Sequence, residues 1–254
     1  MILAVDTGNS NIVLGCMEGL EIRHTLRLKT DRAMSAAGYT VTLQAALAQA
    51  GFSVAGFEGG ILSSVVAAVT EPLRQALSAL LSGPVLVVGK TAKTTLPLCI
   101  DQPETIGADL IAAAEGALAQ YAPPLVLIDM DTATTFSVLD KSGTFLGGAI
   151  APGVQLGAEA LTQRTGLPMT ELSAPQSPLS HSTTDCLCSG IIYGAAAMVD
   201  GMLDRLETAL GTPVTAIATG GLARCVIPHC RRPVTLDDQL LLRGLAVMYR
   251  REMT

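Results

Sequence analysis

A short pattern occurs twice in this chain, roughly half a chain length apart. Residues 4–11 (AVDTGNSN) and residues 127–135 (LIDMDTATT) each combine an apolar strand, an aspartate, a turn, and then hydroxyl or amide side chains. A repeat at this distance favours two similar α/β lobes of roughly 120 residues each, because domains of that size are common. We therefore predict a duplicated domain, broken at Ala122-Pro123-Pro124, with lobes at 1–121 and 122–254.

The composition excludes several classes of protein. Apolar residues make up 49% of the 254 residues, which is enough for a large core and argues against disorder. There is no Trp and there are only four Phe and four Tyr, so the core must be aliphatic. The net charge is −6 without a Lys/Arg-rich run, which argues against nucleic acid and membrane surfaces as partners. An anionic substrate would need backbone amides, a few cations or a bound metal.

The N-terminus and the cysteines favour a cytoplasmic protein. The opening residues lack a basic segment, Asp6 interrupts the first apolar run, and no stretch approaches the roughly 18 apolar residues of a spanning helix. The six cysteines are expected to be reduced and mostly buried. The spacings of Cys186 with Cys188 and of Cys225 with Cys230 match zinc patterns poorly.

The apolar runs predict an opening antiparallel meander followed by alternating helices and strands. Expected strands cover 1–5, 12–16, 22–28, 60–66, 85–88, 125–129, 136–140, 144–150 and 214–218. Expected helices cover 39–50, 71–81, 103–120, 184–210 and 239–251.

The first turn has the residues of a phosphate-binding loop. Gly8 would let backbone N–H groups approach a ligand, and Asn9, Ser10 and Asn11 add short polar side chains. Such a turn can hold phosphate oxygens without a full positive charge. Asp6 would then lie within reach of a magnesium ion or its waters. The same D-x-G-N pattern also occurs in ordinary hairpin turns, so both interpretations remain open here.

A second small-residue turn follows the strand at 214–218. Thr219, Gly220 and Gly221 would let the backbone approach an adenine or a ribose closely. Together with the two acidic turns, they would provide two phosphate clamps and a nucleoside platform. The segment 83–91 only imitates a Walker A loop, because five residues separate its glycines and they are typical of a strand.

Asp109 is the candidate general base. It lies early in the helix predicted at 103–120, where a carboxylate could accept the proton of a substrate hydroxyl attacking a γ-phosphate. Acidic residues also favour the first turn of a helix for electrostatic reasons alone. The residues by themselves leave the two interpretations equal.

These segments resemble the type III pantothenate kinases, nearly from end to end. The matching motifs are Asp6-x-Gly-Asn-Ser-Asn, Ser63-Ser-Val-Val, Pro103-Glu-Thr-Ile-Gly-Ala-Asp109, Asp129-x-x-Thr-Ala-Thr-Thr135, the segment 147–153, Leu167-Pro, Thr183 six residues before Ser189-Gly190, the segment 219–223, and Leu242-x-Gly-Leu245. The resemblance implies two ribonuclease H-like (actin-like ATPase) lobes with a cleft between them. It also implies ATP-dependent phosphorylation of pantothenate towards coenzyme A, a homodimer, a monovalent cation such as K⁺ or NH₄⁺, and Mg²⁺.

The resemblance also implies roles for single residues. Asp109 resembles the general base, Asp129 the ligand of the monovalent cation, and Thr132 an ATP contact in the second phosphate turn. Thr183 is expected to reach the substrate across the dimer. The positions that match the pantothenate pocket are Ile100, Gly107, Ala108, Leu110 and Thr183.

Departures from the family pattern concentrate at the site. Asp131 replaces a glycine of the second phosphate turn, and a carboxylate about 5 Å from a phosphate charge costs about 3 kcal/mol at an effective dielectric near 20. Leu110 replaces an arginine, and Ile100 replaces a tyrosine. Further departures are Ser180-His181-Ser182 and Ala37-Gly38-Tyr39. Three hypotheses follow: a pantothenate kinase with an altered pocket, a catalytically inactive dimer with a binding or regulatory role, and a kinase for another small hydroxylated substrate.

Overall fold

The computed structural model describes residues 1–168 and 171–254, which form two compact units. Unit 1 comprises Met1–Leu96, Asp101–Gln120 and Gln239–Thr254, and unit 2 comprises Pro97–Ile100 and Tyr121–Asp238. The predicted division into 1–121 and 122–254 differs from these units in two segments. Residues 97–100 belong with unit 2, and the C-terminal segment from Gln239 belongs with unit 1.

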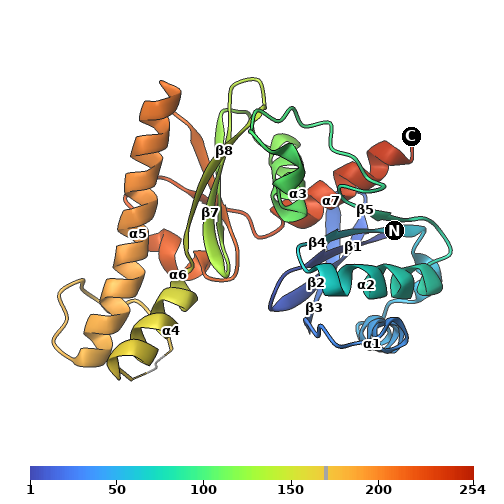
Figure 1. Ribbon diagram of the computed structural model, residues 1–254, viewed down its shortest axis with the longest axis horizontal. Coiled ribbons are helices and arrows are strands. Elements are labelled where there is room, and N and C mark those ends of the chain that lie inside the picture. The colour runs from blue at the N-terminus through green and yellow to red at the C-terminus, as the bar shows by residue number, and fades with distance from the viewer. Residues whose placement is uncertain (169–170) are drawn as a thin grey trace. The chain divides into compact units, whose positions relative to one another are not determined.

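Each unit is built around one sheet (Figure 1). Unit 1 contains β1 (Ile2–Thr7), β2 (Asn11–Glu18), β3 (Glu21–Lys29), β4 (Gly59–Ser64) and β5 (Val85–Val87), with α1 (Ala36–Gln49), α2 (Ala67–Leu80), α3 (Ala108–Leu118), α7 (Leu240–Glu252) and the 3-10 helices η1 (Val54–Gly56) and η2 (Pro103–Thr105). Unit 2 contains β6 (Leu125–Met130), β7 (Ala133–Leu139), β8 (Phe145–Pro152), β9 (Thr215–Thr219) and β10 (Thr235–Leu236), with α4 (Val154–Thr165), α5 (Thr183–Leu210), α6 (Ala223–Val226) and η3 (Ile227–His229).

The two sheets have the same topology. Their strand orders are β3-β2-β1-β4-β5 and β8-β7-β6-β9-β10. In each sheet the central strand, β1 or β6, pairs antiparallel with the next strand in sequence and parallel with the fourth strand of its unit. The duplication predicted from the repeated acidic pattern is therefore confirmed at the level of topology.

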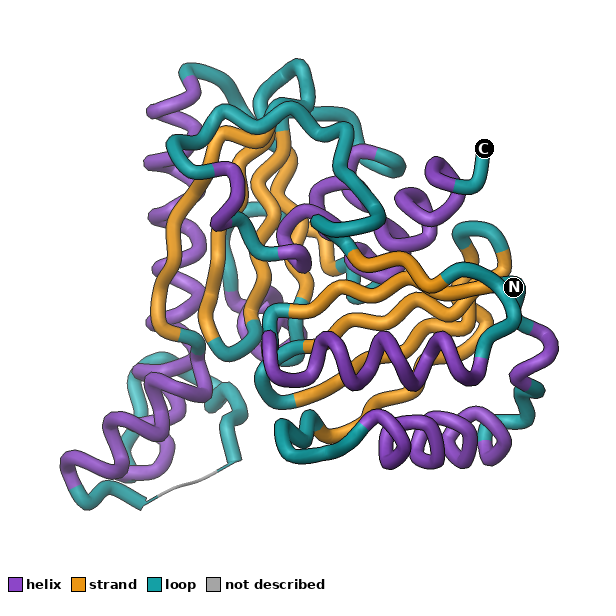
Figure 2. The backbone as a smooth tube through the Cα atoms, turned by 45° about the vertical axis from the view of Figure 1, so that its right-hand side comes forward, coloured by secondary structure: helices purple, strands orange, loops and turns teal. Residues whose placement is uncertain are grey.

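Alternation along β1 assigns the two faces of the unit 1 sheet. Leu3 and Val5 face a core cluster that includes α1 and α2, whereas Ile2 and Ala4 face a second cluster that includes α3 and α7. Figure 2 shows two purple helices running beside the orange strands of this unit, and these are α1 and α2. Helices thus cover both faces of the sheet, and α3 and α7 share one of them.

Close contact between α3 and α7 explains why the C-terminal helix belongs to unit 1. A Cβ atom added at Gly116 of α3 would collide with the Leu240 carbonyl oxygen, and one added at Gly244 of α7 would collide with that of Ala112. The two backbones can approach this closely only because both positions are glycine. A division drawn along the sequence cannot anticipate a contact between segments so far apart in the chain.

Most predicted elements lie where the sequence places them, but the short elements α6 and β10 were not predicted, and two longer helices also differ. The helix predicted at 103–120 is split, because Ile106 and Gly107 are extended and α3 proper starts at Ala108. Helix α4 was not predicted. It is only weakly amphipathic, with Val154, Ala158 and Thr162 buried and most other side chains exposed.

Helix α5 corrects one expectation about membranes. It contains an 18-residue stretch of mean hydropathy 1.6, which is long and apolar enough to cross a membrane by length and composition. The expectation that no such stretch exists was wrong. Ile192, Ala196, Val199 and Leu203 pack into the core of unit 2, so burial against the sheet accounts for the apolar face of this helix.

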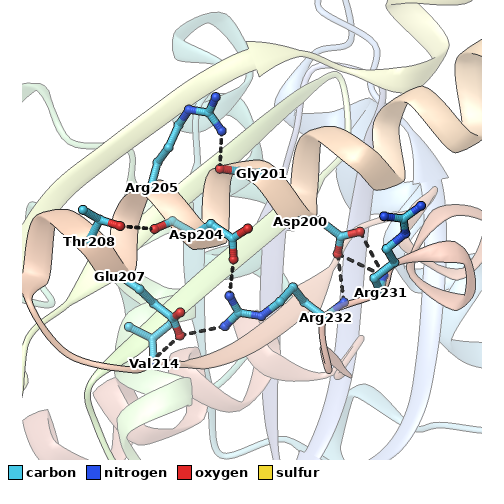
Figure 3. A network of polar contacts seen from close by, with 9 residues as sticks. All are labelled: Asp200, Gly201, Asp204, Arg205, Glu207, Thr208, Val214, Arg231 and Arg232. Atoms are coloured by element: carbon cyan, nitrogen blue, oxygen red, sulfur yellow. Dashed lines mark hydrogen bonds and ion pairs between the residues drawn. The ribbon is translucent and has the colours of Figure 1, made fainter.

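A ladder of acidic side chains fixes the C-terminal half of α5 (Figure 3). Asp200 accepts hydrogen bonds from the backbone N–H groups of Arg231, at 3.1 and 2.9 Å, and of Arg232, at 3.0 Å. The Arg232 guanidinium pairs with Asp204 and, at 2.7 Å, with Glu207. Because these three acids follow one another at helical spacing, one face of α5 holds the segment that leads from η3 to β10.

Glu207 should make the stability of unit 2 sensitive to acid. Hydrogen bonding to Arg232, and then to the Val214 N–H, lowers the pKa of Glu207 below its usual value. This contribution is present above the unfolded pKa, near 4.3, and is lost as pH falls through the lower folded pKa. We expect Glu207→Gln to lower the free energy of unfolding, measured by chemical denaturation, by about 1–2 kcal/mol at pH 7 and by much less at pH 3. The control, Glu159→Gln, changes a carboxylate that is bonded to Gln155. An equal loss from Glu207→Gln at both pH values would contradict this account.

Candidate active site

Equivalent rows of side chains cross the carboxyl end of the central strand in each unit. In unit 1, Asp6 lies opposite Val13 of β2 and Ser63 of β4. Residues at facing register positions project from the same side of a sheet, so the Asp6 carboxylate lies beside the Ser63 hydroxyl. The strand order also reverses beside the central strand, between β1 and β4 and between β6 and β9, and open α/β sheets bind ligands at such a switch point.

In unit 2 the corresponding row is richer in oxygen. Asp129 lies opposite Thr135 of β7 and Thr219 of β9. The Thr135 hydroxyl is buried without a hydrogen-bond partner, and a polar group in that state is costly unless a ligand or water satisfies it. One carboxylate and two hydroxyls are the hard oxygen donors that potassium or magnesium takes. The residues present therefore fit a cation better in unit 2 than in unit 1, where Val13 fills the matching position.

The first turn is held by backbone bonds to the segment after β3. The Gly8 N–H donates to the Asn11 carbonyl at 2.9 Å, which closes the turn. The Thr30 hydroxyl donates to the Gly8 carbonyl at 2.8 Å, and the Thr30 N–H donates to the Ser10 carbonyl at 3.0 Å. Gly8 does not have a positive φ, and a Cβ there would only touch the Asn11 oxygen at 3.5 Å. The turn can therefore form without a glycine at position 8, and the effect of Gly8 is that no side chain covers the turn there.

Arg32 supplies a cation at this turn that sequence reasoning missed. Its guanidinium donates to the Asn9 side-chain oxygen at 2.9 Å, and both residues are exposed. The residue follows a β-strand in a segment without a recognisable motif, so only the three-dimensional contact connects it with the turn.

In unit 2 the structure brings the turn at Thr219, Gly220 and Gly221 against the acidic turn that follows β6. Gly220 has φ +97°, in the left-handed region, and a Cβ there would lie 2.7 Å from the Asp129 carboxylate oxygen and 2.6 Å from the Met130 nitrogen. Glycine is therefore required at this position. The Leu222 N–H donates to the Met130 carbonyl at 3.3 Å, so the 219–222 segment is bonded to the end of β6.

The Asp131 side chain is directed towards this segment. One carboxylate oxygen accepts a hydrogen bond from the Gly221 N–H at 2.8 Å. The next residue, Thr132, lies against the junction of β8 and α4, because a Cβ added at Gly153 would collide with the carbonyl oxygens of both Asp131 and Thr132. The turn at Asp131 and Thr132 thus packs against the start of α4 and is hydrogen-bonded to the turn at 219–221.

The start of α3 presents Asp109 at a helix N-terminus. Gly107, the residue before the helix, is extended and has no side-chain cap. The Asp109 carboxylate accepts a hydrogen bond from the Leu110 N–H at 2.9 Å, and a Cβ on Gly107 would collide with it. Asp109, Ala108 and Leu110 are all half-buried. The N-terminal end of the helix favours the ionised carboxylate, which is the form that a general base needs.

The remaining positions expected in a substrate pocket lie on separate segments of unit 2. Ile100 lies near Gly147 of β8, in a segment held by a hydrogen bond of 2.8 Å from the Cys99 N–H to the Phe145 carbonyl. Thr183 is the first residue of α5 and is exposed.

The cysteines are all free thiols. Cys16 and Cys188 are buried, whereas Cys99 and Cys186 are exposed, so the expectation of mostly buried thiols is only partly met. Burial raises the pKa of the Cys16 thiol to about 11. Over residues 1–168 and 171–254, the structure shows no group of three or more His, Cys, Asp or Glu side chains placed to hold a metal ion.

Comparison with known proteins identifies the family. The family model described as type III pantothenate kinase matches residues 2–205. The type III pantothenate kinase of an Exiguobacterium species is 38% identical over 252 residues, which cover 99% of both chains. The chain belongs to the type III pantothenate kinase family. Membership places it among the kinases, which are phosphotransferases.

Solved structures support the fold. A Baf family transcriptional activator from Campylobacter jejuni is 16% identical with a TM-score of 0.63 and covers 98% of each chain. A 2-dehydro-3-deoxygalactonokinase protein from Sinorhizobium meliloti is 13% identical with a TM-score of 0.60, covering 99% of this chain and 96% of its own. With two equivalent five-stranded sheets, the kinase has the duplicated actin-like ATPase fold that its sequence predicts.

A buried ion pair anchors the helix that carries Asp109 in this kinase. Glu115 lies later in α3 and is 8% exposed. Its carboxylate accepts bonds from the Arg251 guanidinium of α7 at 3.0 Å, from the Thr94 hydroxyl at 2.8 Å and from the Thr95 N–H at 3.3 Å. These bonds fix α3 to α7 and to the segment after β5.

Removing Arg251 alone should lower the free energy of unfolding more than removing the charges of both Glu115 and Arg251. Arg251→Met leaves the Glu115 charge buried without its cation, and we expect a loss of about 2–3 kcal/mol in chemical denaturation. The double variant Glu115→Gln/Arg251→Met, which has no buried charge, should be more stable than Arg251→Met. A double variant that is no more stable than the single one would show that Glu115 is not held as an ion pair.

Proposed function

We propose that this chain is an ATP-dependent kinase that phosphorylates a hydroxyl of pantothenate. Two observations support the proposal: the family assignment, and the recurrence of an aspartate beside a hydroxyl at the same position of two equivalent sheets. The turn that follows each row suits phosphate oxygens, because its backbone N–H groups can hold them.

The nucleotide contacts follow from the turns. The Asp6 turn, through Gly8, Asn9, Ser10 and Asn11, would hold phosphate oxygens of ATP, with Arg32 adding a positive charge at Asn9. The second turn would contribute Thr132. The small-residue turn at Thr219, Gly220 and Gly221 would approach the nucleoside.

Cations belong to the same proposal. Asp129, with the hydroxyls of Thr135 and Thr219 in its row, would hold the monovalent cation, K⁺ or NH₄⁺. Asp6 would hold Mg²⁺ through water. Such cations neutralise phosphate charge in a protein whose own net charge is −6.

Asp109 would act as the general base. Its carboxylate takes the proton of the substrate hydroxyl as that oxygen forms its bond to the γ-phosphorus, while the bond from this phosphorus to the bridging oxygen breaks and ADP leaves. The N-terminal end of α3 stabilises the ionised carboxylate before the reaction. We propose that Gly107, Ala108 and Leu110 around it contact the substrate, and that Ile100 and Thr183 are further substrate contacts.

The same proposal includes a homodimer in which Thr183 reaches the partner's substrate. The support is a shallow hollow of small and flexible side chains on α5, which leaves that surface able to approach a second helix. It is lined by Gly194, Ala197, Met198, Gly201, Met202 and Arg205. We further propose a cytoplasmic location, because the buried face of α5 belongs to the core of unit 2.

One observation favours the alternative of an inactive, binding or regulatory dimer. The Asp131 carboxylate occupies the Gly221 N–H, in the segment proposed to receive the nucleotide. Calorimetric titration of the full chain with ATP, Mg²⁺ and K⁺ separates the two functions, since the inactive alternative predicts no binding at millimolar ATP. If ATP binds but pantothenate is not phosphorylated, a coupled assay across small alcohols tests for another acceptor.

Asp109→Asn should separate catalysis from binding. We expect kcat for pantothenate to fall by at least about 100-fold, because the amide cannot take the proton, while the ATP dissociation constant stays within about threefold. Asp140→Asn is the matched control, since Asp140 lies in the turn between β7 and β8, at the opposite end of the β6–β7 pair from Asp129. An Asp109→Asn enzyme with normal kcat would contradict the assignment of the base.

The homodimer can be tested by light scattering on the eluting protein. We expect a mass twice the 26.2 kDa of the chain. Ala197→Glu, which places a charge on the exposed face of α5, should give monomers, while Val41→Glu on the exposed face of α1 should not. A monomeric wild-type chain, or a dimeric Ala197→Glu variant, would rule out association through α5.

A further inference from the structure

Asp131 occupies the position in unit 2 that Gly8 occupies in unit 1. Each lies two residues after the aspartate at the end of the central strand, and those aspartates are in equivalent registers. Among the described residues, no residue other than glycine has a positive φ, so Asp131 lies there without backbone strain. The internal repeat therefore shows the difference between the two turns: Gly8 places no side chain there, whereas Asp131 places an exposed carboxylate that accepts the Gly221 N–H.

The Asp131 carboxylate joins the turn after β6 to the turn at 219–221. It accepts the Gly221 N–H at 2.8 Å, next to the backbone bond of 3.3 Å from the Leu222 N–H to the Met130 carbonyl. Two successive N–H groups of the small-residue turn are thus bonded to the end of β6 and its turn. A phosphate or hydroxyl oxygen that approaches the Gly221 N–H meets an anion of the protein already bonded to it.

Within residues 1–168 and 171–254, no Lys, Arg or His side chain forms an ion pair with Asp131. Asp129, two residues earlier, adds a second carboxylate. The basic residue that follows the small-residue turn, Arg224, is bonded to Asp238 at 2.7 Å. Neutralisation of Asp131 beside a bound polyanion must therefore come from a cation in solution or from one carried by the ligand.

We propose that Asp131 is a specificity-determining residue, which makes unit 2 accept the phosphates of a nucleotide only as their complex with a divalent cation. The proposal rests on the proposed function. The charge of the Asp131 carboxylate, which is held at the second phosphate turn by the Gly221 N–H, repels a free nucleotide polyphosphate. A divalent cation carried by the nucleotide would offset this repulsion, because a carboxylate oxygen is a ligand that such a cation accepts. The residue that distinguishes this chain from the family pattern then sets its cation requirement.

Two substitutions separate the charge of Asp131 from its hydrogen bond. Asp131→Asn keeps an acceptor for the Gly221 N–H and removes the charge, whereas Asp131→Gly removes both and restores the residue found in the unit 1 turn. Calorimetry of the full chain with ATP, at zero and at saturating Mg²⁺, measures the cation requirement. Without Mg²⁺, both variants should bind ATP at least about tenfold more tightly than the wild type. With Mg²⁺, this advantage should disappear or reverse.

A second measurement needs no ligand. Amide hydrogen exchange should show faster exchange at Gly221 in Asp131→Gly than in the wild type, with protection retained in Asp131→Asn. Asp140→Asn, which removes the same charge at the far end of the β6–β7 pair, should match the wild type in both measurements.

The outcomes distinguish this inference from the function on which it rests. Suppose that the wild type binds ATP and that the Asp131 variants bind it with the same affinity as the wild type, both without and with Mg²⁺. Asp131 then does not set the cation requirement, and the inference fails alone. If Gly221 exchanges equally in all forms, the carboxylate does not hold the turn, and the inference also fails. If neither the wild type nor either Asp131 variant binds ATP under any condition, the proposed function fails and takes the inference with it.

Discussion

The mixed pairing of a central strand is the constraint on which this structure depends. In each unit one strand has an antiparallel neighbour on one side and a parallel neighbour on the other, and an aspartate lies at its carboxyl end. The antiparallel hairpin produces a tight turn that begins two residues after the aspartate. The parallel neighbour brings a hydroxyl residue to the same level. Because both units repeat this arrangement, the chain presents two similar acidic turns, and their differences are then informative. Val13 and Gly8 in unit 1 correspond to Thr135 and Asp131 in unit 2, so unit 1 is more open and unit 2 is richer in oxygen ligands.

The second requirement is a fixed position for the helix that carries Asp109. Gly116 and Gly244 let α3 and α7 approach to backbone contact, and the buried Glu115–Arg251 pair joins the same two helices further along. A carboxylate works as a base only when it is held within hydrogen-bond reach of the proton it removes. The packing of α7 on α3 is therefore part of the catalytic machinery that we propose, although α7 itself carries no candidate site residue.

The sequence predicts the repeated sheets well, because the acidic turns and the apolar strands before them are local patterns. It also places Asp129 at the end of one strand and the turn at 219–221 directly after another. These strands, β6 and β9, prove to be neighbours. It does not predict that α7 joins unit 1, since this depends on two glycines that meet across more than a hundred residues of chain. Helix α4 is missed because its apolar periodicity is weak. The direction of the Asp131 carboxylate is set by a bond to Gly221, ninety positions away, and the proximity of Arg32 to Asn9 is likewise visible only in three dimensions. The site residues themselves remain predictions.

The central claim is that the turn after the central strand of each unit takes part in nucleotide binding. The most direct test is the amide NMR spectrum of the full chain during titration with a non-hydrolysable ATP analogue and Mg²⁺. The account predicts that the amides of residues 8–11, 131–133 and 220–221 all respond, and that they report the same dissociation constant. A response confined to the turn of one unit, or to neither, would contradict it.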